Sequence, residues 1–173
     1  MKKRVNEKRM SLGRKRKFIW AGLRILLGAV FLWAFFDKLL GLGFSTTFEK
    51  AWVNGGSPTY GFLTSSVRGP FADFFGALAG QVWVDWVFMF GLLLIGLALV
   101  LGVLVNFASL FGGIMMFLMW IAVFPPKTNP FVDDHLIYIL VLAGISVVHA
   151  GRYFGFGTWW HNLSVVRKYK WLE

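Results

Sequence analysis

Apolar positions along this chain fall into four long runs, separated by shorter segments that contain polar residues or proline. The runs cover residues 18–43, 84–105, 107–124 and 136–156. A helix needs about 20 mainly apolar residues to cross the hydrocarbon core of a bilayer, and each run is close to that length. The third run is the shortest and can cross only with little tilt. The pattern predicts an all-α integral membrane protein, with one domain built as a bundle of four spanning helices.

The composition strengthens this prediction. Hydrophobic residues make up 57% of the 173 residues, and the mean hydropathy is +0.64. A soluble domain is usually about half apolar or less. The chain also has 9 Trp, a residue that favours the boundary between lipid and water. The first run follows a charged segment, as in a signal peptide, but it is too long and no small-residue cleavage pattern follows it, so we expect an uncleaved span.

Positive charge is unevenly distributed. The net charge is +10, and nine Lys or Arg residues lie in residues 1–17. Four more lie toward the C-terminus: Arg152, Arg167, Lys168 and Lys170. Outside the predicted spans, 13 basic residues thus lie on the side of the two termini. Only three lie on the other side: Lys50, Arg68 and Lys127. Because basic flanks stay in the cytoplasm, we expect both termini there, with cytoplasmic tails 1–17 and 157–173. Basic residues beside a span bind anionic lipids, so membrane lipids rather than nucleic acid are the expected partner.

The loop between the first two runs, residues 44–83, is too long to be a simple turn. It contains a turn cluster at 54–58, and it becomes apolar again from Pro70, with no polar break before the second run. We therefore predict an interfacial or re-entrant helix at about 71–79. The second and third runs are separated so briefly that they must form an antiparallel pair.

Three charged residues lie within the first run: Arg24, Asp37 and Lys38. A charge in hydrocarbon costs at least about 2.5 kcal/mol, so each needs a reason. In the structural interpretation, Arg24 and Lys38 extend to opposite interfaces while Asp37 finds a hydrogen-bonding partner or water. In the functional one, Asp37 and Lys38 line a pocket near the outer end of the span and bind a polar headgroup or exchange protons with it.

The fourth run is preceded by a proline-bounded turn, residues 129–135, that brings Asp133, Asp134 and His135 to a helix start. Capping of the helix by an Asp explains one carboxylate. From His135, a helix would place Tyr138, Ser146 and His149 on one face. This face could bond to neighbouring helices or form a proton or quinone path, since histidine changes charge near neutral pH.

Metal and haem chemistry is not expected. His135 and His149 would be about 21 Å apart along one helix, at about 1.5 Å per residue, so they cannot both ligate one haem iron. The chain has no Cys, which excludes a disulfide, a thiol relay and Cys-ligated clusters within it.

Residues of about 23–160 resemble the DoxX/DoxD family of small prokaryotic membrane proteins. The resemblance rests on the sequence Arg24-Ile-Leu-Leu-Gly28, on Asp37-Lys38-Leu39, on the glycine-rich second run, and on residues 129–135 leading to 150–153. It implies a four-helix bundle in a prokaryotic plasma membrane, and for the DoxD branch it implies the quinone-reactive subunit of a thiosulfate:quinone oxidoreductase.

The resemblance makes a quinone-linked oxidoreductase subunit the preferred function. Quinone is then the expected cofactor, and Asp133, Asp134 and His135 are the catalytic candidates. The cofactor-binding candidates are Asp37, Lys38, Tyr138 and Arg24, and within this scheme Arg24 has a structural role. The electron donor would be a small molecule or a second redox subunit, and a homo-oligomer is an alternative partnership. Two other functions are a non-catalytic scaffold or assembly factor for a redox enzyme, and a small transporter.

Overall fold

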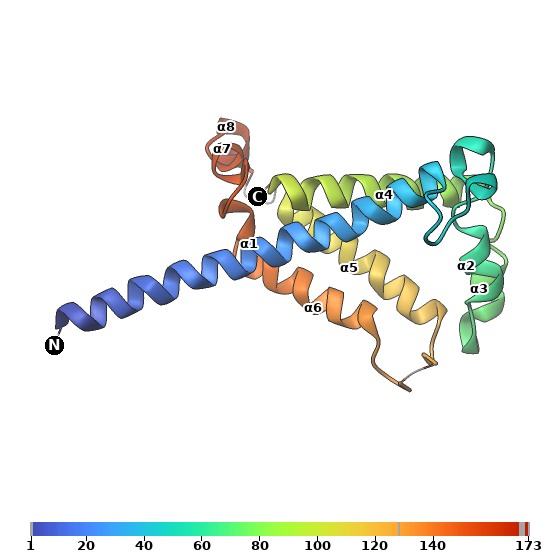
Figure 1. Cartoon of the computed structure of the whole chain (residues 1–173), viewed down its shortest axis with the longest axis horizontal. Helices are drawn as coiled ribbons and strands as arrows, with labels where there is room; N and C mark the ends of the chain where they lie inside the picture. The colour runs from blue at the N-terminus through green and yellow to red at the C-terminus, as the bar shows by residue number, and fades with distance from the viewer. Residues whose placement is uncertain (1, 128, 170–171, 173) are drawn as a thin grey trace.

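The computed structural model describes residues 2–127, 129–169 and 172, and side-chain surroundings from residue 12 onward. The end of the predicted C-terminal tail, residues 170, 171 and 173, lies outside the described residues. All regular structure within the described residues is helical. The main helices are α1 (Lys2–Leu40), α4 (Val82–Leu101), α5 (Val105–Ala122) and α6 (Asp134–Val147). Short helical segments follow α1 and α6 (Figure 1).

Three helices are long and apolar enough to cross a membrane: residues Leu12–Leu40 of α1, all of α4 and all of α5. They correspond to the first three predicted runs. The fourth helix differs from its prediction. α6 has only 14 residues, about 21 Å at 1.5 Å per residue, whereas the predicted run extended to residue 156. The helix ends early because His149 has a left-handed backbone (φ 50°), after which the chain forms the 3-10 turn η4 (Ala150–Arg152).

The basic N-terminal segment, which was predicted as a tail over residues 1–17, is helical from Lys2 onward. The backbone of α1 continues without a break from Lys2 into the apolar part, and Figure 1 shows this N-terminal portion extending away from the other helices. Lys and Arg are good helix formers. The basic segment is therefore a continuation of the first helix.

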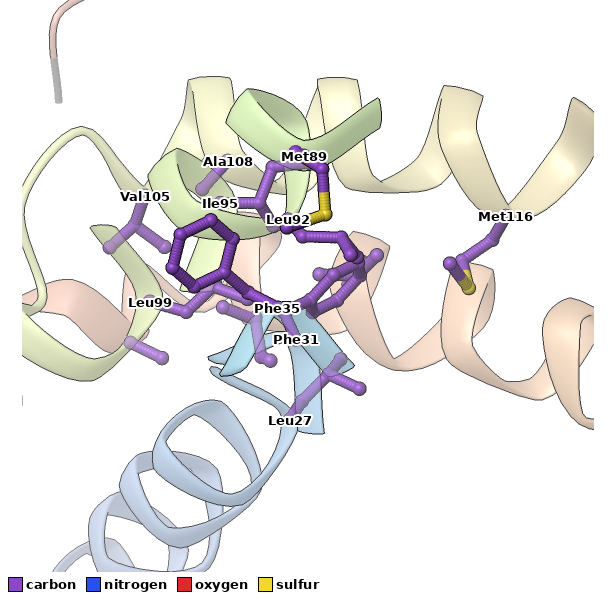
Figure 2. Close-up of a cluster of buried hydrophobic side chains, with 13 residues drawn as sticks. Leu27, Phe31, Phe35, Met89, Leu92, Ile95, Leu99, Val105, Ala108 and Met116 are labelled. Carbon is purple, nitrogen blue, oxygen red and sulfur yellow. The ribbon is translucent and has the colours of Figure 1, made fainter. Parts of the chain in front are cut away.

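The main core lies where α1, α4, α5 and α6 face one another. Buried side chains from α1, α4 and α5 interdigitate in Figure 2, and α6 adds Leu142 and Ile145. On α1 the core residues Leu27, Phe31 and Phe35 repeat every four residues, which places them on one face of the helix. Each of the four helices thus contributes one apolar face to a common core.

Two glycines allow α1 and α4 to approach closely. A Cβ atom at Gly28 would lie 2.9 Å from Cβ of Leu99, and one at Gly96 would lie 2.7 Å from Cγ of Leu32. Both distances are too short for real carbon contacts, so only glycine fits. Small residues have this role at many helix contacts in membrane proteins.

The main helices define two ends of the molecule, which we name by the segments found there. At the loop end, α1 and α5 finish and α4 and α6 begin. At the tail end lie residues 102–104, which join α4 to α5, and the residues after α6: η4, α7 (Gly157–His161) and α8 (Ser164–Lys168). The backbone N–H of Phe156 donates to the carbonyl oxygen of Leu101 at 2.9 Å, which attaches the last segment to α4. The short 102–104 connection is as predicted for an antiparallel pair.

The long loop is structured, as predicted. It contains η1 (Phe48–Lys50), η2 (Trp52–Asn54), α2 (Tyr60–Ser65), η3 (Gly69–Phe71) and α3 (Ala72–Gly76). The helix predicted at 71–79 corresponds to α3, which is shorter, and Pro70 lies in the 3-10 turn just before it. α2 was not predicted, because its sequence has no clear apolar periodicity.

Candidate functional site

The segment leading into α6 is held by hydrogen bonds from its own side chains and from α5. Oδ1 of Asn129 accepts hydrogen bonds from the backbone N–H groups of Phe131, at 3.0 Å, and Val132, at 3.1 Å. Nε1 of Trp120 donates to the carbonyl oxygen of Phe131 at 3.2 Å. These bonds fix the direction from which the chain enters α6 at Asp133.

Asp133 both caps α6 and contacts the imidazole of His135. Its Oδ1 accepts hydrogen bonds from the backbone N–H groups of His135, at 3.1 Å, and Leu136, at 3.4 Å. The predicted capping role is therefore confirmed. Its Oδ2 lies 2.7 Å from Nδ1 of His135. One carboxylate thus starts the helix and orients the ring two residues later.

The orientation of His135 gives its two ring nitrogens different roles. Nδ1 faces Asp133, whereas Nε2 has no hydrogen-bond partner among the described residues. The side chain of His135 is 16% exposed and that of Asp133 only 9%. When Nδ1–H is donated to the carboxylate, Nε2 accepts a hydrogen bond in the neutral ring and donates one in the charged ring. The pair can therefore take up or release a proton at Nε2.

Asp134 differs from Asp133 in being open to solvent. Its side chain is 72% exposed, and Oδ1 lies 3.9 Å from Nδ1 of His135. The ligand atoms of Asp133, Asp134 and His135 lie within 4.8 Å of one another, close enough to share a cation. All three come from consecutive residues, and none of the described residues of another helix joins the group. Asp133 already bonds to His135 and to the N–H groups at the start of α6. We therefore describe Asp133 and His135 as a pair that shares a proton, rather than as ligands of a cation.

Tyr138 lies one turn after His135 on α6, and residues three apart share a helix face. It is partly buried against the main core, and no described residue hydrogen-bonds to its hydroxyl. The predicted stripe does not continue to the end. Oγ of Ser146 donates to Oδ1 of Asn106 on α5 at 2.8 Å. His149 lies beyond the end of α6. The four polar residues therefore do not form one continuous stripe: His135 and Tyr138 lie at the loop end, Ser146 bonds to α5, and His149 lies at the tail end.

Asp37 and Lys38 are used by the loop that follows α1. The carboxylate of Asp37 is 1% exposed. It accepts hydrogen bonds from the backbone N–H groups of Phe44, at 3.2 Å, and Ser45, at 3.0 Å, and from the hydroxyl of Ser45. Nζ of Lys38 donates to Oγ of Ser45 at 3.3 Å. The structure thus provides the hydrogen-bonded partner that the structural interpretation required for Asp37.

The two predicted groups at the loop end are not brought together. Figure 1 shows the end of α1 and the start of α6 at separate places, and no hydrogen bond or ion pair within the described residues joins Asp37 or Lys38 to Asp133, Asp134 or His135. The candidate site therefore consists of the residues at the start of α6.

Arg24 lies far from this site, at the tail end. It does not extend to the surface as expected: its side chain is 0% exposed. Nη1 donates to the carbonyl oxygen of Gly151 at 3.3 Å and Nη2 to that of Phe154. Gly102 makes room for the guanidinium, because a Cβ there would lie 1.9 Å from Nη1. Arg24 therefore makes structural hydrogen bonds at the tail end, away from the other cofactor-binding candidates.

Sequence reasoning missed a second buried carboxylate at the loop end. Asp85, near the start of α4, is 6% exposed. Its Oδ1 accepts hydrogen bonds from Oγ of Ser57 at 2.9 Å, Oγ1 of Thr59 at 2.6 Å and the backbone N–H of Thr59 at 3.1 Å. The signal was available, since a charge within an apolar run needs a partner. Asp85 and Asp37 both hold the long loop against the ends of helices.

Comparisons with protein-family models, with curated proteins and with solved structures find no match to this chain. The resemblance to the DoxX/DoxD family rests on the sequence motifs given above alone. What the protein does has to be argued from the arrangement of its own side chains, above all those at the start of α6.

Proposed function

We propose that this chain is a multi-pass membrane protein, similar to the DoxX/DoxD family, that binds a quinone at the start of α6 as a subunit of a quinone-linked oxidoreductase. The observation that supports it best is the His135–Asp133 pair, with Nδ1 held at 2.7 Å and Nε2 without a described partner. Such a pair suits a ligand whose carbonyl oxygens gain and lose protons.

The surroundings of the pair match the rest of a quinone. Phe131, Val132 and Ile137 at the start of α6 are all large apolar residues with exposed side chains. An apolar ring and its isoprenoid tail are recognised by such surfaces, while a few polar groups fix the orientation. His135 and the hydroxyl of Tyr138 supply those polar groups on one face of the helix. The donor set fits a quinone without any metal ligand.

The residues of the chain would act as follows. His135 donates a proton from Nε2 or accepts one there, and Asp133 stabilises the charged imidazole and keeps the ring in place. Asp134, which is exposed, exchanges protons with water beside Nδ1. A bound quinone takes up two electrons and two protons when it is reduced to the quinol. The electrons come from outside this chain, from a reductant such as thiosulfate or from a partner subunit, because the chain has no Cys.

The same proposal includes the membrane arrangement. α1, α4, α5 and the shorter α6 form a four-helix membrane bundle in the plasma membrane of a prokaryote, with the loop end outside and the tail end in the cytoplasm. The 13-to-3 distribution of basic residues supports this orientation. The quinone site then lies in the outer half of the bilayer.

The test is to purify the full chain from membranes in mild detergent and to measure quinone in the extracted lipid by chromatography and mass spectrometry. We expect quinone to co-purify, and its ratio to protein to fall at least fivefold in His135→Gln. His161→Gln, the same change at the tail end, is the matched control and should keep the quinone. An equal ratio in all three proteins would rule out the site.

A non-catalytic scaffold is the second candidate, and one observation favours it. Asp37, Asp85 and Ser146 have their side chains hydrogen-bonded within the chain, and both terminal nitrogens of Arg24 donate to backbone carbonyl groups. If purification recovers a redox enzyme but no quinone, the scaffold function holds instead. A small transporter has less support, because α1, α4 and α5 each run unbroken, unlike the interrupted helices of many transporters.

A further inference from the structure

Helices α5 and α6 are antiparallel, and contacts at both ends fix how they lie against each other. At the tail end, Oγ of Ser146 donates to Oδ1 of Asn106 at 2.8 Å. At the loop end, Nε1 of Trp120 donates to the carbonyl oxygen of Phe131 at 3.2 Å. The two helices therefore remain together from the start of α5 to the segment that enters α6.

His135 lies on the side of α6 that meets α5. Leu142 and Ser146 follow it by about two and three turns, at 3.6 residues per turn, so the three residues share one face. Both later residues contact α5: Ser146 by its hydrogen bond, and Leu142 through Cδ1, which lies 3.1 Å from the position of a Cβ atom at Gly112. The side chain of His135 is only 16% exposed, as expected for a ring placed between two helices.

The same contacts give the level of His135 along α5. In the chain, His135 lies between Phe131 and Leu142 and is closer to Phe131. It is therefore closer to the level of Trp120 than to that of Gly112, beside the last two turns of α5. Residues 116–121 in these turns include two aromatic residues and no ionisable one. This part of α5 can thus offer rings and apolar groups to a ligand of His135, but no proton.

Phe117 and Trp120 form an aromatic row on these turns. Their rings are stacked, with centroids 5.9 Å apart and planes inclined by 25°. Both residues follow Asn106 by close to whole numbers of turns, about three and four, so they lie on the side of α5 that meets α6. Phe117 is 47% exposed, so its ring is only partly covered by protein.

A second aromatic pair on α5 lies nearer the tail end. Phe107 and Phe111 are also stacked, with centroids 6.2 Å apart, and Phe111 is 54% exposed. Stacked phenylalanines on this helix are therefore not in themselves a sign of a site. The row at Phe117 differs because it is level with His135, and because Trp120 bonds to the segment that enters α6.

We propose that Phe117 and Trp120 form a second wall of the quinone site, facing the His135–Asp133 pair. The quinone ring lies between α5 and α6, with one carbonyl oxygen at Nε2 of His135 and its face against the ring of Phe117. Trp120 covers the loop side of the quinone and holds the entry segment at Phe131. This inference rests on the proposed function and adds to it the residues that recognise the planar ring, which the polar groups of α6 do not.

The first test compares Phe117→Leu with Phe111→Leu, the same change at a similarly exposed ring of the same helix. The full chain is purified from membranes, and quinone in the extracted lipid is measured against protein. An aromatic contact is worth about two- to tenfold in binding, so Phe117→Leu should lower the ratio at least about twofold. Phe111→Leu should keep the wild-type ratio. Equal ratios in these two variants, with quinone still lost in His135→Gln, would remove α5 from the site and leave the proposed function standing.

The second test uses the wild-type chain and does not depend on the folding of a variant. The purified protein is illuminated with an azidobenzoquinone that carries a short isoprenoid tail, with and without excess unlabelled quinone. The chain has no Lys or Arg between Arg68 and Lys127 or between Lys127 and Arg152, so trypsin separates α5 from α6. We expect label that unlabelled quinone displaces on both peptides, at residues 117–120 and 131–138. Such label on the α6 peptide alone would overturn the second wall, and its absence from both peptides would overturn the quinone site as well.

Discussion

Arg24 and Gly151 are 127 residues apart, yet Nη1 of Arg24 donates a hydrogen bond to the carbonyl oxygen of Gly151 at 3.3 Å. The bond joins the first spanning helix to the segment that follows α6. A second bond, from Nη2 to the carbonyl oxygen of Phe154, supports it. The buried guanidinium of Arg24 thus links α1 to the segment after α6 at the tail end.

Arg24→Met should therefore destabilise the protein strongly. The substitution removes the donors of the buried Gly151 carbonyl and of the partly buried Phe154 carbonyl. An unsatisfied buried acceptor costs about 1 to 3 kcal/mol, so we expect a loss of about 1 to 4 kcal/mol. Unfolding in detergent, followed by tryptophan fluorescence, measures it. Arg167→Met is the control, because Arg167 is exposed and bonded only to Asn162 among the described residues. If both variants unfold alike, Arg24 does not have this role.

Gly102→Ala tests the same contact from the other side. Gly102 has a left-handed backbone (φ 78°), and a Cβ atom would lie 1.9 Å from Nη1 of Arg24. We expect a loss of more than about 1 kcal/mol. Gly113→Ala is the matched change in α5, where a Cβ meets nothing within 4 Å. It should be neutral or slightly stabilising, since Ala favours a helix. Equal stabilities of the two variants would contradict the packing.

Asp37→Asn should loosen the long loop without removing quinone. Asp37 holds Phe44 and Ser45 with both carboxylate oxygens, and an amide has only one acceptor oxygen. Losing a hydrogen bond to a charged group costs about 1.5 to 3 kcal/mol. Faster amide hydrogen exchange at residues 44 and 45 is the expected result. Asp85→Asn should have its effect at residue 59 instead. A loss of quinone in Asp37→Asn, with retention in Asp85→Asn, would return Asp37 to the site.

Asp133→Asn and Asp134→Asn separate capping from proton exchange at the start of α6. Asn caps a helix about as well as Asp, so both variants should keep their stability within about 0.5 kcal/mol. Asp133→Asn removes the charge beside Nδ1 of His135 and should lower the quinone-to-protein ratio severalfold. Asp134→Asn changes an exposed group and should have little effect on retention. If Asp134→Asn lowered quinone retention more than Asp133→Asn, the exposed carboxylate of Asp134 would be the more important group, as expected for a solvent-facing site or a cation site.

The long helices could be predicted from the sequence because their apolar runs are long enough to show membrane-spanning length, as in α4 and α5. The end of α6 could not. The apolar run extends to Phe156, and this pattern fits both a continued helix and a chain that turns at His149 and covers Arg24. Hydrophobicity alone therefore cannot distinguish the two paths. The left-handed backbone that decides this has no local sequence signal.

The candidate site was predicted in part for a similar reason. Capping by Asp133 is a local effect of neighbouring residues and was expected. The partners of Asp37 depend on the path of the loop, and those of Arg24 come from the opposite end of the chain. A charge in an apolar run predicts that a partner exists, but the fold determines which one.

The proposed orientation can be measured directly because the chain has no Cys. Lys127 follows α5 at the loop end and Lys168 ends α8 at the tail end, and both side chains are exposed. Changing either lysine to Cys leaves the strong asymmetry of basic residues intact, so the orientation should persist. In intact cells, Lys127→Cys should react with a membrane-impermeant maleimide, whereas Lys168→Cys should react only after permeabilisation. The opposite pattern would invert the molecule and move the His135–Asp133 pair to the cytoplasmic half of the bilayer.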